Sequence, residues 1–307
     1  MRDDVKAAVG RGLEMVEEGA DLLDVGAEST RPGAQPVSAE DEIARVVPVI
    51  EALAARVAVP ISIDTSKPEV MRAAVAAGAG FLNDVRALRR EGALDAAAEL
   101  KVPVCVMHMQ GEPGTMQDDP HYDDVVGEVH RFLAERVFAC EMAGIDKRRV
   151  LVDPGFGFGK TLAHNLALLR GLERFRDLGA GVFVGVSRKG MIGTLTGRKS
   201  GAERATGSAA AAMIAVQRGA MIVRVHDVAA TRGALTMWQA VHGRKQTGTV
   251  TIERSRQSDA YDHLDRHAPW QSSTGGVHPQ STIATFSGLT DLRLRRWANL
   301  HPVTSNG

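Results

Sequence analysis

Short apolar segments alternate with longer amphipathic segments along most of this chain. Seven of the apolar segments predict strands, at residues 21–26, 60–64, 80–84, 102–108, 150–153, 182–187 and 221–226. A predicted helix follows each strand, and one further helix, over residues 1–18, precedes them all. Near-continuous apolar strands that alternate with helices are typical of a parallel sheet covered by helices. The pattern predicts an α/β fold.

Almost every predicted strand ends in a polar or charged residue. These residues are Asp24, Asp64, Asn83, Asp84, His108, Asp153, Ser187, Arg188, Lys189, Arg224 and His226. An open doubly wound sheet gathers its ligand groups at one switch point, whereas a barrel collects them from the ends of all its strands. The pattern therefore favours a (β/α)8 TIM barrel. Because the chain begins with a helix, we expect the barrel to lack its first β-strand unless the C-terminal segment supplies one.

Charge balance and hydropathy exclude several classes of partner. Lys+Arg and Asp+Glu each number 37 among 307 residues, which gives no indication of a nucleic acid or an anionic membrane as partner. No apolar run approaches the roughly 18 residues of a membrane-spanning helix, and the polar start does not resemble a signal peptide. Cys105 and Cys140 are predicted to be buried free thiols, which fits a reducing compartment. These features predict a soluble, cytoplasmic protein.

The chain is predicted to divide into a barrel, residues 1–241, and a poorly structured C-terminal extension, residues 242–307. Apolar residues are scattered through the extension, and no further strand–helix unit can be traced there. It holds five of the ten histidines, without the spacing of a metal site. Only residues 289–300 resemble a short basic amphipathic helix, so a small docking element is the alternative.

A glycine-rich loop follows the strand predicted at residues 150–153. The sequence DPGFGFGK, residues 153–160, ends the strand on a carboxylate and continues with a proline and three glycines. Glycines permit a tight loop with few side chains, from which two phenylalanines and a lysine project. A carboxylate beside flat apolar rings and a cation suits a planar ligand with polar edges.

Seven segments at successive strand ends carry a resemblance to a known family. They are GAESTRPGA (26–34), ISIDTSKPEV (61–70), FLNDV (81–85), VMHMQGEPGTMQ (106–117), DPGFGFGK (153–160), GVSRKGMIG (185–193) and RVHDV (224–228). In this order the chain resembles dihydropteroate synthase, the folate-pathway enzyme inhibited by sulfonamides. The resemblance covers residues 1–241. It implies a (β/α)8 barrel that joins 6-hydroxymethyl-7,8-dihydropterin diphosphate to 4-aminobenzoate and releases pyrophosphate.

The resemblance also implies which residues bind the pterin: Asp64, Asn83, Val85, Met107, Asp153, Lys189 and Arg224. A pterin has an amino-pyrimidinone edge with adjacent N–H donors, and a buried carboxylate such as Asp153 matches this pair. Lys189 would reach the pterin carbonyl. The flat guanidinium of Arg224 would stack on the ring, as a lysine could not.

By the same resemblance, Thr30, Arg31, Arg224 and His226 bind the diphosphate, and Arg31, Pro32, Phe158, Lys189 and Gly190 bind the aminobenzoate. Many family members have a serine where this chain has Gly190. The implied reaction is SN1-like: pyrophosphate leaves, a resonance-stabilised pterin cation forms, and the neutral amine attacks it. Catalysis would then depend on positioning and electrostatics, with Lys189, Arg224, His226 and Arg31 as the catalytic residues.

The first twenty residues depart from the family's pattern. Complete members open with a strand and a loop of the type N-V-T-P-D-S-F, whose asparagine binds diphosphate and Mg²⁺, and residues 1–20 do not match it. The resemblance implies Mg²⁺ as a cofactor and leaves open which residues of this chain would bind it. It also implies a homodimer formed through barrel helices.

Two alternatives stay open. A pterin-binding methyltransferase domain would share the barrel and the pterin contacts, although the SRK, RVHD and STRP sequences favour the synthase. The missing first strand would suit a truncated paralogue that binds pterin with impaired or no catalysis. An NAD-binding fold is excluded because no GxGxxG sequence follows a predicted strand.

Overall fold

Seven parallel strands form the wall of a barrel in the computed structural model, which describes residues 2–29, 36–112, 115–242 and 281–285. The strands are β1 (Leu22–Val25), β2 (Ile61–Asp64), β3 (Phe81–Asp84), β4 (Val104–Met107), β5 (Val150–Asp153), β6 (Gly181–Val184) and β7 (Ile222–Val225). Each pairs in parallel with the next along the chain. Six of the seven lie within the predicted segments, whereas β6 begins one residue before its predicted segment and ends at Val184, three residues before the predicted end. The predicted barrel class is confirmed.

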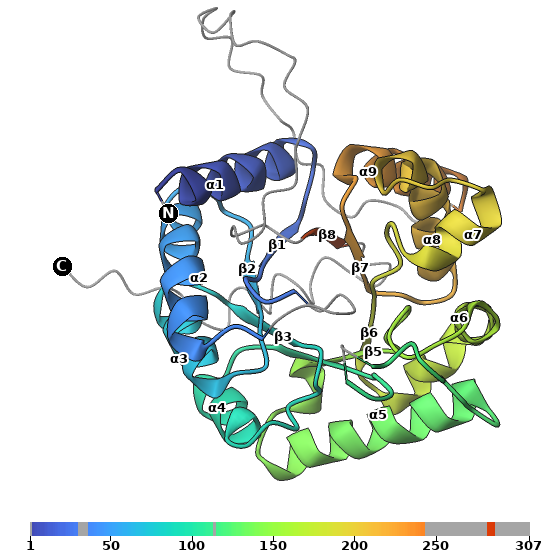
Figure 1. The fold of residues 1–307 in the computed structure, drawn as a ribbon, viewed down its shortest axis with the longest axis horizontal. Helices are drawn as coiled ribbons and strands as arrows, with labels where there is room; N and C mark the ends of the chain where they lie inside the picture. Colours follow the sequence, from blue (N-terminus) through green and yellow to red (C-terminus); the bar gives the residue numbers. More distant parts are fainter. Residues whose placement is uncertain (1, 30–35, 113–114, 243–280, 286–307) are drawn as a thin grey trace, which may run out of the picture.

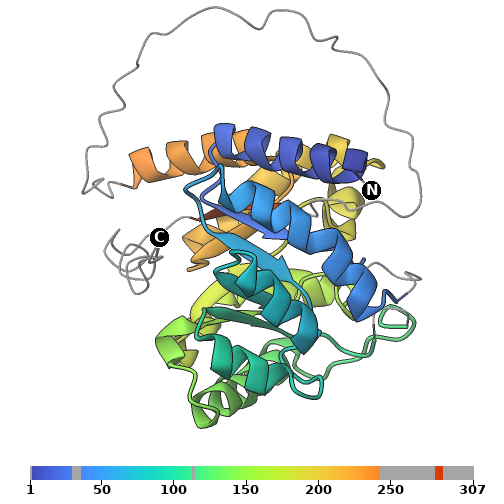
Figure 2. The same cartoon turned by 90° about the vertical axis from the view of Figure 1, so that its left-hand side faces the viewer.

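Helices surround the strands as an outer ring (Figure 1). They are α1 (Arg2–Glu17), α2 (Ala39–Ala54), α3 (Pro68–Ala76), α4 (Ala93–Leu100), α5 (Val125–Met142), α6 (Leu162–Arg170), α7 (Gly190–Thr196), α8 (Ala205–Gln217) and α9 (Val228–Val241). The side view in Figure 2 shows α1 to α4 covering one flank of the barrel. Ser38 caps α2 by accepting a hydrogen bond from the Asp41 N–H at 3.0 Å.

Two stretches differ from the predicted helices. Where one helix is predicted after β5, the structure has α6 and the 3₁₀ segment η2 (Leu172–Leu178), and Gly171 lies between them. Helix α7 was not predicted, because seven residues are too few to show a helical period. It begins immediately after Lys189, so it belongs to the loop region that carries the SRK sequence.

An eighth strand, β8 (Ser281–Thr285), closes the barrel between β7 and β1 (Figure 1). It runs antiparallel to both neighbours, with Ser281 opposite Asp24 and Ile283 opposite Arg224. The strand comes from the C-terminal extension, where sequence periodicity indicated none. It lies between β7 and β1, where a regular (β/α)8 barrel has a parallel strand. The helix predicted at 289–300 lies outside the described residues.

The barrel interior is apolar at one end and polar at the other. Six side chains from six strands fill the end where the strands begin: Leu22, Phe81, Cys105, Leu151, Phe183 and Ile222. A larger cluster packs between the strands and the helices. Both Cys105 and Cys140 are buried free thiols, as predicted. None of the described helices has the length and apolar character needed to cross a membrane. These six apolar side chains fill one end of the barrel interior. The polar side chains lie at the other end, where the strands finish.

Candidate active site

One arginine bridges two buried carboxylates across the mouth of the barrel. Arg224 donates from Nε to Asp24 Oδ2 at 2.7 Å and from Nη2 to Asp64 Oδ2 at 3.2 Å. Asn83 Nδ2 also donates to Asp24 Oδ2, at 3.2 Å. Burial, together with the neighbouring Asp24, raises the pKa of Asp64, and Arg224 opposes that rise. The single guanidinium neutralises one carboxylate, and the raised pKa of Asp64 lets the other carry a proton.

Sequence reasoning noted Asp24 at a strand end and assigned it no role in the site. Its side chain is buried, and its Oδ1 atom has no hydrogen-bond partner among the described residues. A buried carboxylate oxygen without a partner costs free energy, so it is a strong acceptor for any donor that enters the site. The only sequence signal for this role was the carboxylate at the end of β1.

Asp153 lies at the end of β5, facing the glycine-rich loop. Its Oδ1 accepts a hydrogen bond from the Gly155 N–H at 2.7 Å. Burial raises the pKa of Asp153 to about 6, against the opposing effects of that hydrogen bond and of Lys189 and Lys160. The carboxylate is therefore ionised at neutral pH, in a site from which water is largely removed.

The glycine-rich loop packs backbone to backbone against the loop after β4. Gly155 has φ +71°, and a Cβ at this position would lie 1.8 Å from the carbonyl oxygen of His108. A Cβ on Gly159 would lie 2.4 Å from the carbonyl oxygen of Gln110. Only glycine fits such close approaches, which explains the composition of the loop.

An apolar wall lies beside the carboxylates. Met107, Met109 and Met116 form a cluster with Val85 and Phe158 packed against it. The Nζ of Lys189 lies 4.1 Å from the centre of the Phe158 ring, within the range of a cation–π contact. The structure thus brings together Val85, Met107, Phe158 and Lys189, which the resemblance placed in the pterin and aminobenzoate sites.

Lys160 and His108 form a buried pair beneath this wall, which sequence reasoning missed. Lys160 Nζ lies 3.0 Å from His108 Nδ1 and donates to the Phe158 carbonyl oxygen at 2.9 Å. Burial lowers the pKa of Lys160 to about 7 and that of His108 to about 3. The pair joins the loops after β4 and β5, which carry Met109 and Phe158 of the apolar wall.

His226 lies at the end of β7 and contacts the SRK sequence after β6. Its backbone N–H donates to Ser187 Oγ at 3.2 Å, and its ring Nδ1 lies 3.1 Å from the same oxygen. Burial and then the nearby Arg224 and Arg188 lower the pKa of His226 to about 4. The imidazole is therefore uncharged at neutral pH before an anion binds, and it offers a hydrogen bond rather than a positive charge.

Three predicted residues, Thr30, Arg31 and Pro32, lie outside the described residues. The described ends of their loop are held by Glu28, which accepts from the Val37 N–H at 3.1 Å and from Lys67 Nζ at 2.7 Å. Gly190 is the first residue of α7, and a Cβ there would meet no atom within 4 Å. A serine at this position would therefore fit.

A closed barrel with carboxylates, an amide and a guanidinium at one end, beside an apolar wall, defines a class of protein. It is a barrel enzyme with a site for a flat ligand whose edges carry hydrogen-bonding groups.

Comparisons with known proteins identify the ligand class and the family. The family described as "Pterin binding enzyme" matches residues 1–226. The dihydropteroate synthase of Escherichia coli (strain K12) is 52% identical over 239 residues, which are 78% of this chain and 84% of that protein. The chain therefore belongs to the dihydropteroate synthase family of pterin-binding enzymes.

Solved structures agree with this placement. The dihydropteroate synthase of Xanthomonas albilineans with 4-aminobenzoic acid is 64% identical, with a TM-score of 0.75 over 78% of this chain and 85% of that one. The Yersinia pestis enzyme with a sulfonamide drug is 47% identical, with a TM-score of 0.75 over 76% of this chain and 85% of that one. These matches give no support to the methyltransferase or to the non-catalytic paralogue.

Proposed function

We propose that this protein condenses 6-hydroxymethyl-7,8-dihydropterin diphosphate with 4-aminobenzoate to give 7,8-dihydropteroate and pyrophosphate. The observation that carries this proposal is the meeting of Asp64, Asn83, Asp153 and Arg224 at one end of a closed barrel, with Lys189 against the adjacent apolar wall. This is the residue set that the family resemblance assigns to the pterin. A structure of the Xanthomonas albilineans synthase with 7,8-dihydropteroate, 60% identical and with a TM-score of 0.72, supports it.

Recognition of the pterin would begin with Asp153. Its carboxylate is ionised and desolvated, so it gains most from two N–H donors on the edge of a planar ring. Asn83 supplies an amide beside it, and Asp64 can present a protonated or an ionised oxygen to the other ring. Arg224 is fixed through Nε and Nη2 by two carboxylates, which leaves the faces of its guanidinium for stacking.

The chemical step would break the C–O bond between the pterin methylene and the diphosphate, with the electron pair leaving on pyrophosphate. The buried carboxylates of Asp24 and Asp153 would stabilise the pterin cation. The amine nitrogen of aminobenzoate then attacks the methylene and loses a proton. Arg31, Lys189, Arg224 and His226 would stabilise the leaving group, and the pKa of His226 would rise toward its usual range beside that anion.

Magnesium would enter with the substrate. The described residues contain no group of three or more histidine, cysteine or acidic side chains that could hold a metal ion. Mg²⁺ is commonly held by substrate phosphates, waters and only one or two carboxylates. The partnerless Asp24 Oδ1 could supply one such oxygen, so we propose that the ion binds mainly to the diphosphate and neutralises its charge.

A homodimer would cover the outer surface of α7 and α8. Thr206, Ala210 and Ile214 follow one another at helical spacing on the exposed side of α8, and two of the three are apolar. Leu195 of the neighbouring α7 is 56% exposed. Apolar side chains exposed on neighbouring helices mark surfaces that a protein partner can cover, which supports such a partner here. The buried free thiols of Cys105 and Cys140 support a cytoplasmic location.

The direct test is pyrophosphate release by the full-length protein, supplied with dihydropterin diphosphate, Mg²⁺ and 4-aminobenzoate. We expect release that depends on aminobenzoate and is inhibited competitively by a sulfonamide. Binding of a pterin without any aminobenzoate-dependent release would contradict the proposal. It would assign the chain to the pterin-binding, non-catalytic alternative.

A further inference from the structure

Arg188 lies between Ser187 and Lys189 in a strained backbone conformation. The Lys189 N–H donates to the Val186 carbonyl oxygen at 3.3 Å, which closes a tight turn with Arg188 as its third residue. Arg188 has φ +58°, in the left-handed region that glycine usually fills at this position of a turn. A residue kept in such a conformation must be held there by its surroundings.

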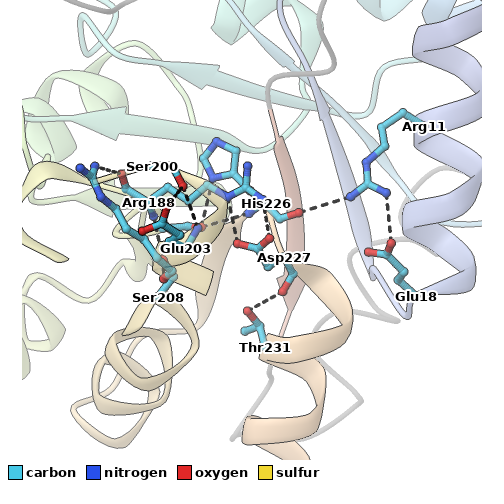
Figure 3. A network of polar contacts seen from close by, with 11 residues as sticks. Arg11, Glu18, Arg188, Ser200, Glu203, Ser208, His226, Asp227 and Thr231 are labelled. Atoms are coloured by element: carbon cyan, nitrogen blue, oxygen red, sulfur yellow. Dashed lines mark hydrogen bonds and ion pairs between the residues drawn. The ribbon is translucent and has the colours of Figure 1, made fainter. Parts of the chain in front are cut away.

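Both backbone polar groups of Arg188 are held by helical segments outside the barrel. Its N–H donates to Ser208 Oγ of α8 at 2.9 Å. Its carbonyl oxygen accepts from Arg204 Nη1 at 3.1 Å. Figure 3 shows Arg188 and Ser208 on the same side of this network. The left-handed conformation is therefore fixed from two sides.

The side chain of Arg188 is fixed from a third side. Its Nε donates to Asp227 Oδ2 at 3.0 Å, and its Nη2 donates to Asp227 Oδ1, which makes a bidentate ion pair. Asp227 lies at the start of α9, and its carbonyl oxygen accepts from the Thr231 N–H at 3.1 Å and from Thr231 Oγ1 at 2.9 Å. The ion pair therefore joins the loop after β6 to the start of α9 (Figure 3).

We infer that the Arg188–Asp227 pair is a positioning device for the condensation, an inference that rests on the proposed function. Arg188 is next to Lys189 in sequence, and Asp227 is next to His226 and three residues from Arg224. A second link, between Ser187 Oγ and His226, runs beside the ion pair. Together the two links set the separation between Lys189 and the Arg224–His226 side of the site, without either member of the pair touching the substrates.

The rival interpretation is that Arg188 itself binds the diphosphate. The two interpretations differ in what they predict for Asp227. If Arg188 acts by its charge, removal of the cation and removal of its neutralising anion should have opposite effects on diphosphate binding. If the pair acts by position, Arg188→Ala and Asp227→Asn should have the same effect, and the double variant should be no worse than either single one.

The test is a double-mutant cycle in the pyrophosphate-release assay, with the wild-type protein as the reference for the proposed function. We expect each single variant to lower kcat roughly 10- to 100-fold, as displacements near 1 Å do in other active sites. The KM for dihydropterin diphosphate should stay within about threefold, and the double variant should match the singles. An Arg188→Ala variant with raised KM and unchanged kcat, beside a normal Asp227→Asn variant, would overturn the inference.

Two controls separate positioning from loss of folding. Arg72→Ala removes a matched but exposed arginine that pairs with Glu99 on the helix ring, and we expect unchanged kcat. Arg188→Gly permits the left-handed backbone but lacks the ion pair, and added methylguanidinium should restore its kcat whereas methylammonium should not. Equal rescue by both cations, or by neither, would contradict a bidentate positioning role. An inactive wild-type protein would refute the proposed function instead.

Discussion

At the scale of single residues, burial of Asp153 determines how the site responds to pH. Its pKa is raised to about 6, mainly by burial, so the carboxylate becomes protonated as the pH falls through that value. Only the ionised form can accept both N–H donors of a pterin edge. We therefore expect the affinity for a pterin analogue to be nearly constant above about pH 7, to halve near pH 6 and to approach a tenfold fall per pH unit below that. Calorimetric titration between pH 5 and 8 would measure this.

The matched control for that experiment is Asp153→Asn. The amide keeps the shape but not the charge, so binding should be weak and independent of pH over the same range. A wild-type affinity that does not change between pH 5 and 7 would show that Asp153 is not the group that pairs with the pterin.

Of two glycines of the site, one should lose stability on addition of a methyl group and the other should not. Gly155→Ala places a Cβ 1.8 Å from the His108 carbonyl oxygen in a backbone with φ +71°. We therefore expect the unfolding free energy to fall by about 1–3 kcal/mol or more. Gly190→Ala meets no atom within 4 Å and should change stability by less than about 0.5 kcal/mol. Urea denaturation of both variants measures the difference. Equal stabilities would show that the two loops are not packed as described.

Sequence patterns predicted the strand-end residues well and their contacts poorly. Asp64, Asn83 and Asp153 could be identified because each ends an apolar segment. The bridge from Arg224 to Asp24 joins residues 200 positions apart, and no local pattern encodes it. The Lys160–His108 pair was missed for the same reason, since burial of a lysine depends on how two loops pack.

At the scale of elements, β8 determines whether the barrel is closed. Ile283 lies opposite Leu22 of β1 and Arg224 of β7. A proline at this position lacks the N–H that a central strand contributes to its ladder, so we expect Ile283→Pro to lower the unfolding free energy by about 1–3 kcal/mol. Pterin affinity should fall as well, because Asp24 and Arg224 are held by the two strands that β8 joins.

Thermal unfolding and pterin titration of Ile283→Pro test this prediction, with Ile283→Val as the control that keeps both the N–H and the β-branched shape. Loss of affinity in the proline variant alone would support closure by β8. Unchanged stability and affinity in both variants would mean that the strand is not needed for the barrel.

The parallel strands and β8 differ in how strongly the sequence encodes them. Each parallel strand is an apolar segment buried on both faces, and its pattern is visible without knowledge of its partners. The segment STIAT at 281–285 is short and mixes polar with apolar residues. Its strand conformation follows from the two unpaired edges that β1 and β7 present, which is tertiary information.

At the scale of the whole molecule, the exposed side of α7 and α8 is where we expect a second copy. Ile214 of this surface is 38% exposed. A charge there would be buried without a partner in a dimer, so Ile214→Glu should give a monomer while the wild type is a dimer. Size-exclusion chromatography with light scattering distinguishes the two.

The control is Met237→Glu on α9, where the side chain is 66% exposed on a different helix. This variant should elute as the wild type does. A monomeric wild-type protein, or a dimer disrupted by Met237→Glu and not by Ile214→Glu, would show that the interface is elsewhere.

The antiparallel pairing of β8 with β1 and β7 also determines when the barrel can close during synthesis. Strand β1 leaves the ribosome early, but its partner β8 lies near the other end of the chain. Until residues 281–285 have emerged, the nascent protein has two unpaired edges, and the strands that carry Asp24 and Arg224 are not yet joined. A neighbouring nascent chain could meanwhile insert its own β8 between β7 and β1. Such an exchange of an identical element produces domain-swapped assemblies.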